Sequence, residues 1–145
     1  MVSIRSVIPF VAALAFVIGG PKVAEAAKQP AAKEHVVIQV SDGDTKTWNQ
    51  ALNVVKNLQQ AYGKNKVVVR VVAFGNGIGM LQMESVVGTR VQEAMSSGTQ
   101  IVACQNTMKG HHLTPQDMLS KIGYVPAGVV DIIKKERAGW AVVRP

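Results

Sequence analysis

Residues 67–74 read Val-Val-Val-Arg-Val-Val-Ala-Phe, a run in which only Arg70 is polar. A strand that is apolar on both faces is typical of a parallel sheet covered by helices on each side. Shorter apolar runs rich in β-branched residues occur at 35–40, 101–104 and 140–143. The stretches between these runs carry apolar residues at three- and four-residue spacing, which indicates helices. The sequence therefore predicts an α/β three-layer sandwich with a mostly parallel sheet of about four to five strands.

Helices are expected in all the intervening stretches. The first begins after the N-cap residue Asp44 and ends at Gly63, and the second ends at Gly98. A short helix is expected after residue 104, another from Thr114, and a last one over 126–139. The expected apolar faces of the four longer helices are, in chain order, Trp48, Leu52, Val55, Leu58 and Tyr62; Met83, Val87, Val91, Ala94 and Met95; Met118, Leu119 and Ile122; and Val129, Val130 and Ile133.

The length and composition exclude several classes of protein. A chain of 145 residues is long enough for one domain, and its single cysteine excludes a disulfide framework and a Cys-rich zinc or iron–sulfur centre. The formal net charge is +7, but the basic residues are spread out. Their one tight group, Lys134, Lys135 and Arg137, lies at an expected helix end, where cations are favoured. We therefore interpret the charge as a contribution to solubility and expect no nucleic-acid partner.

The first 26 residues have the pattern of a secretory signal peptide. Arg5 precedes an uncharged apolar run over 7–18, and Ala24-Glu25-Ala26 provides the small residues of a cleavage site. We expect a flexible leader over 27–34 and a folded domain over 35–145, located in the periplasm without stable membrane insertion. An uncleaved membrane anchor is the alternative, and it is disfavoured because the run is shorter than the roughly 20 residues that span a bilayer.

Ligands of parallel α/β sheets gather at the carboxyl ends of the strands, which selects the loops 41–44, 75–79 and 104–112. Cys104 ends a predicted strand and precedes a short helix, so the positive helix pole and nearby Lys109 would stabilise its thiolate. Such a thiolate, with no second cysteine to form a disulfide, suits a carrier that holds sulfur as a persulfide. The alternative is a buried, inert cysteine, since free cysteine is among the most buried residue types.

His111 and His112 follow Cys104 closely, and cysteine and histidine are ligands of zinc and copper. Their spacing matches no usual ligand pattern, so we interpret them as solvated loop residues, of which one could assist proton transfer at the thiol. We expect no metal and no cofactor.

The segment Gly75-Asn76-Gly77-Ile78-Gly79 follows a strand, as a dinucleotide-binding loop does. Its spacing is G-x-G-x-G, it lies in the second βα turn, and no clear acidic residue ends the following strand, so dinucleotide binding is disfavoured. Binding of a small anion by its backbone N–H groups stays open.

Asp42 and Asp44 are close in sequence and could serve as a general base or as cation ligands. A helix cap explains Asp44, however, and Asp42 is a usual turn residue. The Ser/His/Asp order of a hydrolase and the lysine pattern of a P-loop are both absent from the sequence.

Taken in this order, the segments resemble the DsrE/DsrF-like family of sulfur-relay proteins, and more closely its exported, single-domain branch. The resemblance covers nearly all of residues 35–145. The matching segments are Val40-Ser41-Asp42-Gly43-Asp44, Trp48-Asn49, Ala51-Leu52-Asn53, Ala73-Phe74-Gly75-Asn76-Gly77-Ile78-Gly79, Val102-Ala103-Cys104-Gln105-Asn106-Thr107-Met108, Gly123-Tyr124-Val125-Pro126-Ala127-Gly128-Val129-Val130 and Gly139-Trp140.

The resemblance implies a parallel α/β fold and a homo-oligomer, commonly a trimer or hexamer. It also implies that Cys104 matches the cysteine that carries a persulfide in the sulfur-relay members. Those members are cytoplasmic and differ after the cysteine, so the resemblance assigns neither the sulfur donor nor the acceptor.

The leading hypothesis is therefore a periplasmic protein in which Cys104 takes up and releases sulfane sulfur. Asn106 and Thr107 would stabilise the anionic sulfur. The residues expected to line the rest of the site are Asp42, Gly75, Asn76, Gly77 and Gly79. The alternative is a non-catalytic module, with a structural cysteine, that binds a small ligand or another subunit.

Overall fold

The structure is a computed structural model that describes residues 32–145. The expected signal peptide (1–26) and most of the expected leader (27–34) lie outside the described residues. Glu34, which we expected in the leader, is instead the first residue of a strand.

Five parallel strands form the sheet, in the order β4-β3-β2-β1-β5. The strands are β1 (Glu34–Val40), β2 (Val67–Ala73), β3 (Gln100–Cys104), β4 (Gly123–Val125) and β5 (Ala141–Val143). The chain therefore moves outward from β1 to one edge of the sheet and then crosses back, so that β5 pairs with the other side of β1. This confirms the predicted α/β three-layer sandwich and the predicted parallel sheet.

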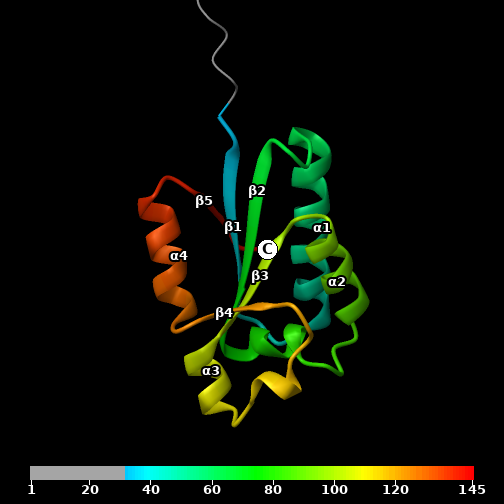
Figure 1. The fold of residues 1–145 in the computed structure, drawn as a ribbon, viewed down its shortest axis with the longest axis vertical. Coiled ribbons are helices and arrows are strands. Elements are labelled where there is room, and N and C mark those ends of the chain that lie inside the picture. The colour runs from blue at the N-terminus through cyan, green and yellow to red at the C-terminus, as the bar shows by residue number, and fades with distance from the viewer. Residues whose placement is uncertain (1–31) are drawn as a thin grey trace, which may run out of the picture.

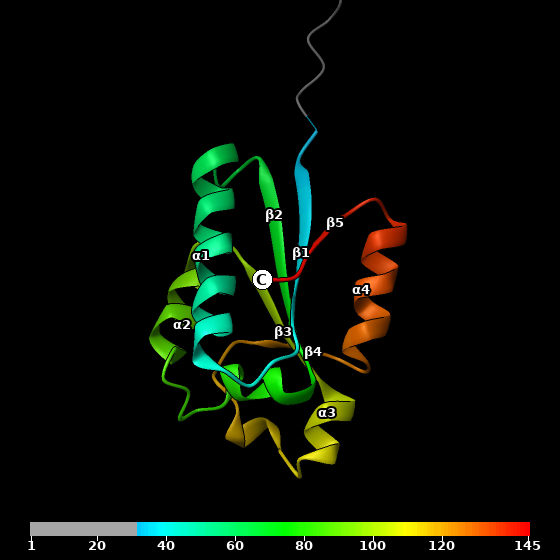
Figure 2. The same cartoon turned by 180° about the vertical axis from the view of Figure 1, so that it is seen from behind.

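Helices cover the two faces of the sheet unequally. α1 (Thr45–Tyr62) and α2 (Gly88–Ser96) cover one face, and α4 (Gly128–Arg137) lies alone on the other (Figures 1 and 2). The short α3 (Gln105–Gly110) lies beyond the end of the sheet to which the strands point. Within the described residues no helix combines the length and hydropathy needed to cross a bilayer.

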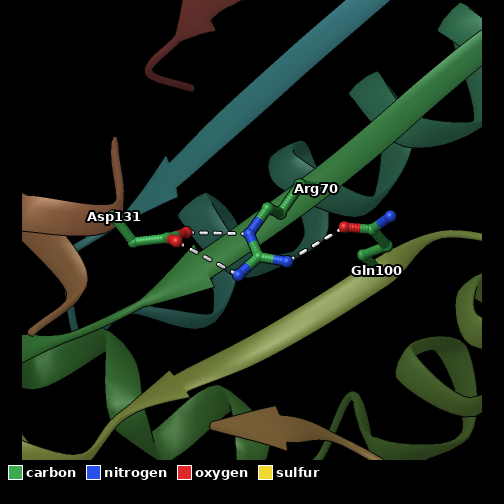
Figure 3. A network of polar contacts seen from close by, with 3 residues as sticks. All are labelled: Arg70, Gln100 and Asp131. Atoms are coloured by element: carbon green, nitrogen blue, oxygen red, sulfur yellow. Dashed lines mark hydrogen bonds and ion pairs between the residues drawn. The ribbon is translucent and has the colours of Figure 1, made fainter. Parts of the chain in front are cut away.

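The alternation of β2 places its residues in two separate cores. Val69 and Val71 belong to the large core under α1 and α2, and Val72 belongs to the smaller core under α4. Arg70 shares the α4 face with Val72 and forms an ion pair with Asp131 of α4 (Figure 3). The single polar residue of this strand is thus accommodated by a partner on the covering helix.

The second predicted helix is shorter than expected. The predicted loop over 75–79 is part of a 3₁₀ helix, η1 (Gly75–Leu81), and α2 begins only at Gly88. Met83, expected on the buried helix face, is 64% exposed in the connection between them. Its backbone N–H donates to the carbonyl of Asp117, which ties this connection to a distant loop instead of to a helix.

The predicted helix from Thr114 is wrong, although its start is correct. Thr114 and Asp117 form the expected capping box, but the 3₁₀ helix η2 (Pro115–Asp117) ends at once. Met118 is extended and forms an antiparallel bridge with Gln82, and Leu119 donates to the carbonyl of Leu81. Tertiary hydrogen bonds to the end of η1 therefore replace the helix.

The end of the chain differs from expectation in two ways. Strand β4 was not predicted, since its three residues are too few to show a pattern. The last helix starts at Gly128, and its buried face is formed by Gly128 and Ile132. The three residues predicted for that face point to solvent instead, with exposed fractions of 50% for Val129, 48% for Val130 and 40% for Ile133.

Candidate functional site

The carboxyl ends of the parallel strands meet at the end of the sheet where α3 lies (Figure 1). Cys104 is the last residue of β3 and the N-cap residue of α3. Its side chain is buried, with an exposed fraction of 5%. The cysteine is therefore at the predicted edge of the sheet, but under other residues.

The segment that follows β4 covers the thiol. Gly128, the first residue of α4, is so close that a Cβ added to it would lie 3.3 Å from the Cβ of Cys104 and 3.1 Å from that of Phe74. The backbone N–H of Asn106 donates to the carbonyl of Pro126 at 3.1 Å, which holds α3 against this segment. The sulfur thus lies where the N-termini of α3 and α4 meet.

Two opposing effects act on the Cys104 thiol. Burial raises the pKa of the thiol, but the Thr107 hydroxyl and the nearby backbone N–H groups of Gly128, Thr107 and Asn106 lower it by more, so the net pKa is below its ordinary value. These donors stabilise the thiolate more than the neutral thiol. The site therefore favours the form of cysteine that attacks sulfur.

Thr107 connects two of the predicted loops. The backbone N–H of Gly75 donates to Thr107 Oγ1 at 3.0 Å. The same hydroxyl group lowers the pKa of the Cys104 thiol. Of the residues predicted for the site, Cys104, Thr107, Gly75 and the backbone of Asn106 are brought together, while the side chain of Asn106 is exposed.

The other glycines of 75–79 pack against the end of β1 and the start of α1. A Cβ on Gly77 would lie 2.2 Å from the carbonyl oxygen of Val40, and a Cβ on Gly79 would lie 3.1 Å from the Trp48 ring. The N–H of Gly77 donates to the carbonyls of Ser41 and Phe74, and that of Gly75 is engaged by Thr107. Close packing accounts for these glycines, and neither of the two N–H groups is free for an anion.

Asp42 and Asn76 are exposed at the same end of the sheet. Asn76 lies against the backbone at Gly43, and the carbonyl of Asp42 accepts a hydrogen bond of 2.7 Å from the Trp48 indole. Asp44 is the N-cap of α1: its carboxylate accepts from the backbone N–H groups of Lys46 and Thr47. These contacts fix the β1–α1 connection and form no link to the sulfur.

His111 and His112 lie at the end of α3, and both are exposed. His112 has a φ of 55°, a left-handed backbone conformation. No three His, Cys, Asp or Glu side chains within the described residues gather as metal ligands would, so Cys104 and the two histidines do not form such a group.

One neighbour of the sulfur was missed at the sequence level: Gly128. The signal that could have identified Gly128 is strand β4, because the loop after each parallel strand lies at the same end of the sheet. With Gly123–Val125 recognised as a strand, the following Pro-Ala-Gly would have joined the three selected loops.

No protein-family model and no curated protein matches this sequence. Solved structures do share the fold. A protein of unknown function from Methanobacterium thermoautotrophicum, MTH1491, is 27% identical over 78% of this chain and 100% of its own, with a TM-score of 0.74. A conserved protein of unknown function from Bacteroides thetaiotaomicron, BT1422, is 15% identical over 77% of this chain and 95% of its own, with a TM-score of 0.64.

The ychN protein from E. coli is 7% identical over 78% of this chain and 99% of its own, with a TM-score of 0.60. This chain therefore spans nearly the full length of all three proteins, and their similarity supports an α/β fold of this architecture.

Proposed function

We propose that this protein carries sulfane sulfur as a persulfide on Cys104, as the resemblance to the DsrE/DsrF-like family implies. The observation that supports the proposal most is the position of the sulfur between the N-termini of α3 and α4. Backbone N–H groups of Asn106, Thr107 and Gly128 and the Thr107 hydroxyl all lower the pKa of this thiol. An inert cysteine needs no such set of donors.

The transfer itself needs no external oxidant. The Cys104 thiolate attacks the outer sulfur of a donor persulfide, R–S–SH, so that a new S–S bond forms, the donor S–S bond breaks and R–S⁻ leaves. The proton stays on the outer sulfur. In the second half-reaction an acceptor thiolate attacks that outer sulfur, and Cys104 leaves as a thiolate. The donors around Cys104 favour this step because a low thiol pKa makes a better leaving group.

Intact-mass spectrometry tests the proposal directly. The purified protein is incubated with inorganic polysulfide and desalted, and its intact mass is then measured. We expect an adduct of one sulfur atom, about 32 Da, that dithiothreitol removes and that Cys104→Ser abolishes. The absence of this adduct, or its persistence in Cys104→Ser, would reject the carrier role.

A second function is favoured by the burial of the thiol. Cys104 is only 5% exposed, and it lines neither the cavity beside Arg70 nor the cavity beside Arg90. A ligand-binding or assembly module with a structural cysteine would have this property. Iodoacetamide labelling separates the two: a carrier is labelled in the folded state faster than global unfolding allows, whereas a structural cysteine is labelled only at the unfolding rate.

The proposed homo-oligomer is supported by the outer face of α4. Val129, Val130 and Ile133 are 40–50% exposed there, although the solvent face of a surface helix is normally polar. We propose that a second copy covers this face. Sedimentation should show an assembly larger than one chain, and Ile133→Lys should dissociate it, whereas Lys134→Ala on the same helix should not.

We also propose that the protein works in the periplasm and exchanges sulfur with a donor or acceptor protein there. Support comes from the signal-peptide pattern of residues 1–26. Cell fractionation with and without these residues tests the location: the complete chain should enter the periplasmic fraction and the truncated chain should not.

A further inference from the structure

A notch is present at the edge of the sheet beside β3, at the end away from Cys104. Strand β4 pairs with β3 only from Val102 onward, so Gln100 and Ile101 have no strand on that side. The resulting cavity has a volume of about 550 Å³, which is within the range of small-molecule sites. We call it the edge notch; the lining residues used below are Arg70, Met95, Thr99, Gln100, Ile101 and Lys121.

Arg70 enters the edge notch as a rigidly held guanidinium. Its Nε and Nη2 donate to the two carboxylate oxygens of Asp131 at 2.8 and 3.2 Å, and its Nη1 donates to Gln100 Oε1 at 2.9 Å (Figure 3). A guanidinium has five N–H groups, so one on Nη1 and one on Nη2 are left without a partner among residues 32–145. The Arg70 side chain is thus held by Asp131 of α4 and by Gln100 of β3, and two of its N–H groups remain available to a ligand.

Two further donors line the edge notch. Thr99 is a buried polar residue, 5% exposed, whose Oγ1 accepts a hydrogen bond from Gln59 Nε2, while its own proton has no acceptor in the described part of the chain. Lys121 adopts a φ of 66°, a left-handed conformation that residues other than glycine and asparagine seldom take. Its ammonium group forms no ion pair with any residue of 32–145.

The charges around the edge notch indicate the charge of the ligand that it would bind. None of the described residues that line it is acidic, so the spare donors have no acceptor of their own. Asp131 neutralises Arg70, which leaves one positive charge, that of Lys121. One net positive charge suits a monoanion better than a doubly charged phosphate. Met95, which is partly buried, supplies an apolar contact for the remainder of such a molecule.

We propose that the edge notch binds a small organic carboxylate, with its carboxylate on Arg70 and Lys121 and its apolar part against Met95. A planar carboxylate accepts from a guanidinium in a two-pronged arrangement, which a single ammonium cannot offer. The site does not depend on the sulfur chemistry of Cys104, because none of the donors to that sulfur lines the notch.

Heteronuclear NMR of the purified protein tests the proposal with acetate, hexanoate and 3-phenylpropionate as probes. The primary amide of each acid serves as its neutral control. We expect one of the acids at millimolar concentration to shift the backbone amide signals of Gln100, Ile101 and Gly123, and the matching amide to leave them unchanged. Inorganic phosphate should shift them less than that acid.

Matched variants test whether the positive charge of Lys121 contributes to binding. Lys121→Asn keeps a residue that tolerates the left-handed conformation, and we expect it to weaken acid binding about fivefold. Lys66→Asn removes the same charge from an exposed turn elsewhere and should change nothing. Arg70→Lys retains a positive charge beside Asp131 but loses the two-pronged donor arrangement of the guanidinium. We expect it to weaken acid binding more than Lys121→Asn does.

Four results would overturn the proposal. They are the absence of shifts with all three acids, equal shifts with acids and amides, an affinity that Lys121→Asn leaves intact, and stronger binding of phosphate than of any acid. None of these outcomes bears on the persulfide of Cys104, which is measured separately by mass.

Discussion

The backbone N–H of Gly75 donates to the hydroxyl oxygen of Thr107 at 3.0 Å, across the gap between the β2 and β3 connections. The same hydroxyl group lowers the pKa of the Cys104 thiol. Gly75, the first residue of the glycine-rich segment, therefore contacts the threonine that acts on the cysteine.

Thr107→Val should reduce the reactivity of Cys104. The substitution preserves shape but removes the hydroxyl that stabilises the thiolate, so the thiol pKa rises and less thiolate is present at neutral pH. A hydrogen bond to a charged group is worth about 1.5–3 kcal/mol, which corresponds to a rate of alkylation roughly 10- to 150-fold lower at pH values below both pKa values. The measurement is the pH profile of iodoacetamide labelling.

Thr107→Ser is the matched control, since serine retains the hydroxyl. It should restore a rate within about twofold of the wild type. An identical pH profile in all three proteins would mean that the hydroxyl has no influence on the sulfur.

Gly77→Ala should be strongly destabilising. Its Cβ would lie 2.2 Å from the carbonyl oxygen of Val40 and 2.7 Å from the carbonyl carbon, and neither backbone atom has room to move. We expect the free energy of unfolding to fall by about 3 kcal/mol.

Gly110→Ala provides the contrast for that experiment. Gly110 is helical, and a Cβ there meets nothing within 4 Å, so alanine should be neutral or stabilise by up to about 1 kcal/mol. Urea denaturation of both variants measures the difference; equal stability would show that the approach of Gly77 to β1 is not tight.

The ion pair of Arg70 and Asp131 should contribute measurably to stability. Both side chains are 15% exposed and the contact is two-pronged, so the pair is less screened than most surface pairs. We expect a coupling of about 1 kcal/mol from the double-mutant cycle Arg70→Gln, Asp131→Asn, measured by urea denaturation. The coupling should shrink in high salt, and zero coupling at low salt would contradict it.

Acid should destabilise the protein partly through Asp44. Hydrogen bonds from the Thr47 hydroxyl and backbone N–H, and from the N–H of Lys46, lower the pKa of this carboxyl below 3.8. Because the folded-state pKa is the lower one, the stabilisation is present above the unfolded pKa and is lost as the pH falls through the folded value.

Asp44→Ala should therefore lower the thermal midpoint more at pH 7 than at acid pH, because the acid form of Asp44 has already lost its charged cap. Asp44→Asn retains a capping oxygen, so it should show a smaller deficit than Asp44→Ala, and this deficit should also shrink at acid pH. A pH-independent deficit in Asp44→Ala would exclude the charge as the cause.

Local sequence patterns were sufficient to predict four of the five strands and the cap of α1. Val67–Ala73 is covered by helices on both faces of the sheet. Its nearly continuous run of apolar residues therefore predicts a buried strand whichever helices cover it. Asp44 likewise caps a helix through bonds to residues two and three positions away. Structural features that depend on local interactions of this kind can be predicted from the sequence.

Structural features that depend on contacts between distant segments could not be predicted from the sequence. Met118 and Leu119 have helical spacing, yet hydrogen bonds to the end of η1 hold them extended. Val129, Val130 and Ile133 form an apolar stripe, but the approach of Gly128 to Phe74 turns the opposite side of α4 to the sheet. The same approach brings Gly128 to Cys104, so this part of the site could not be predicted from spacing.

The order of the strands has a consequence for synthesis on the ribosome. Gln39 of β1 and Arg144 beside β5 are hydrogen-bonded although they are 105 positions apart. The outer edge of β1 therefore stays unpaired while the nascent chain emerges, and it closes only when the last residues are released. An open strand edge is a template for aggregation, so a chain truncated before Ala141 should aggregate as it refolds.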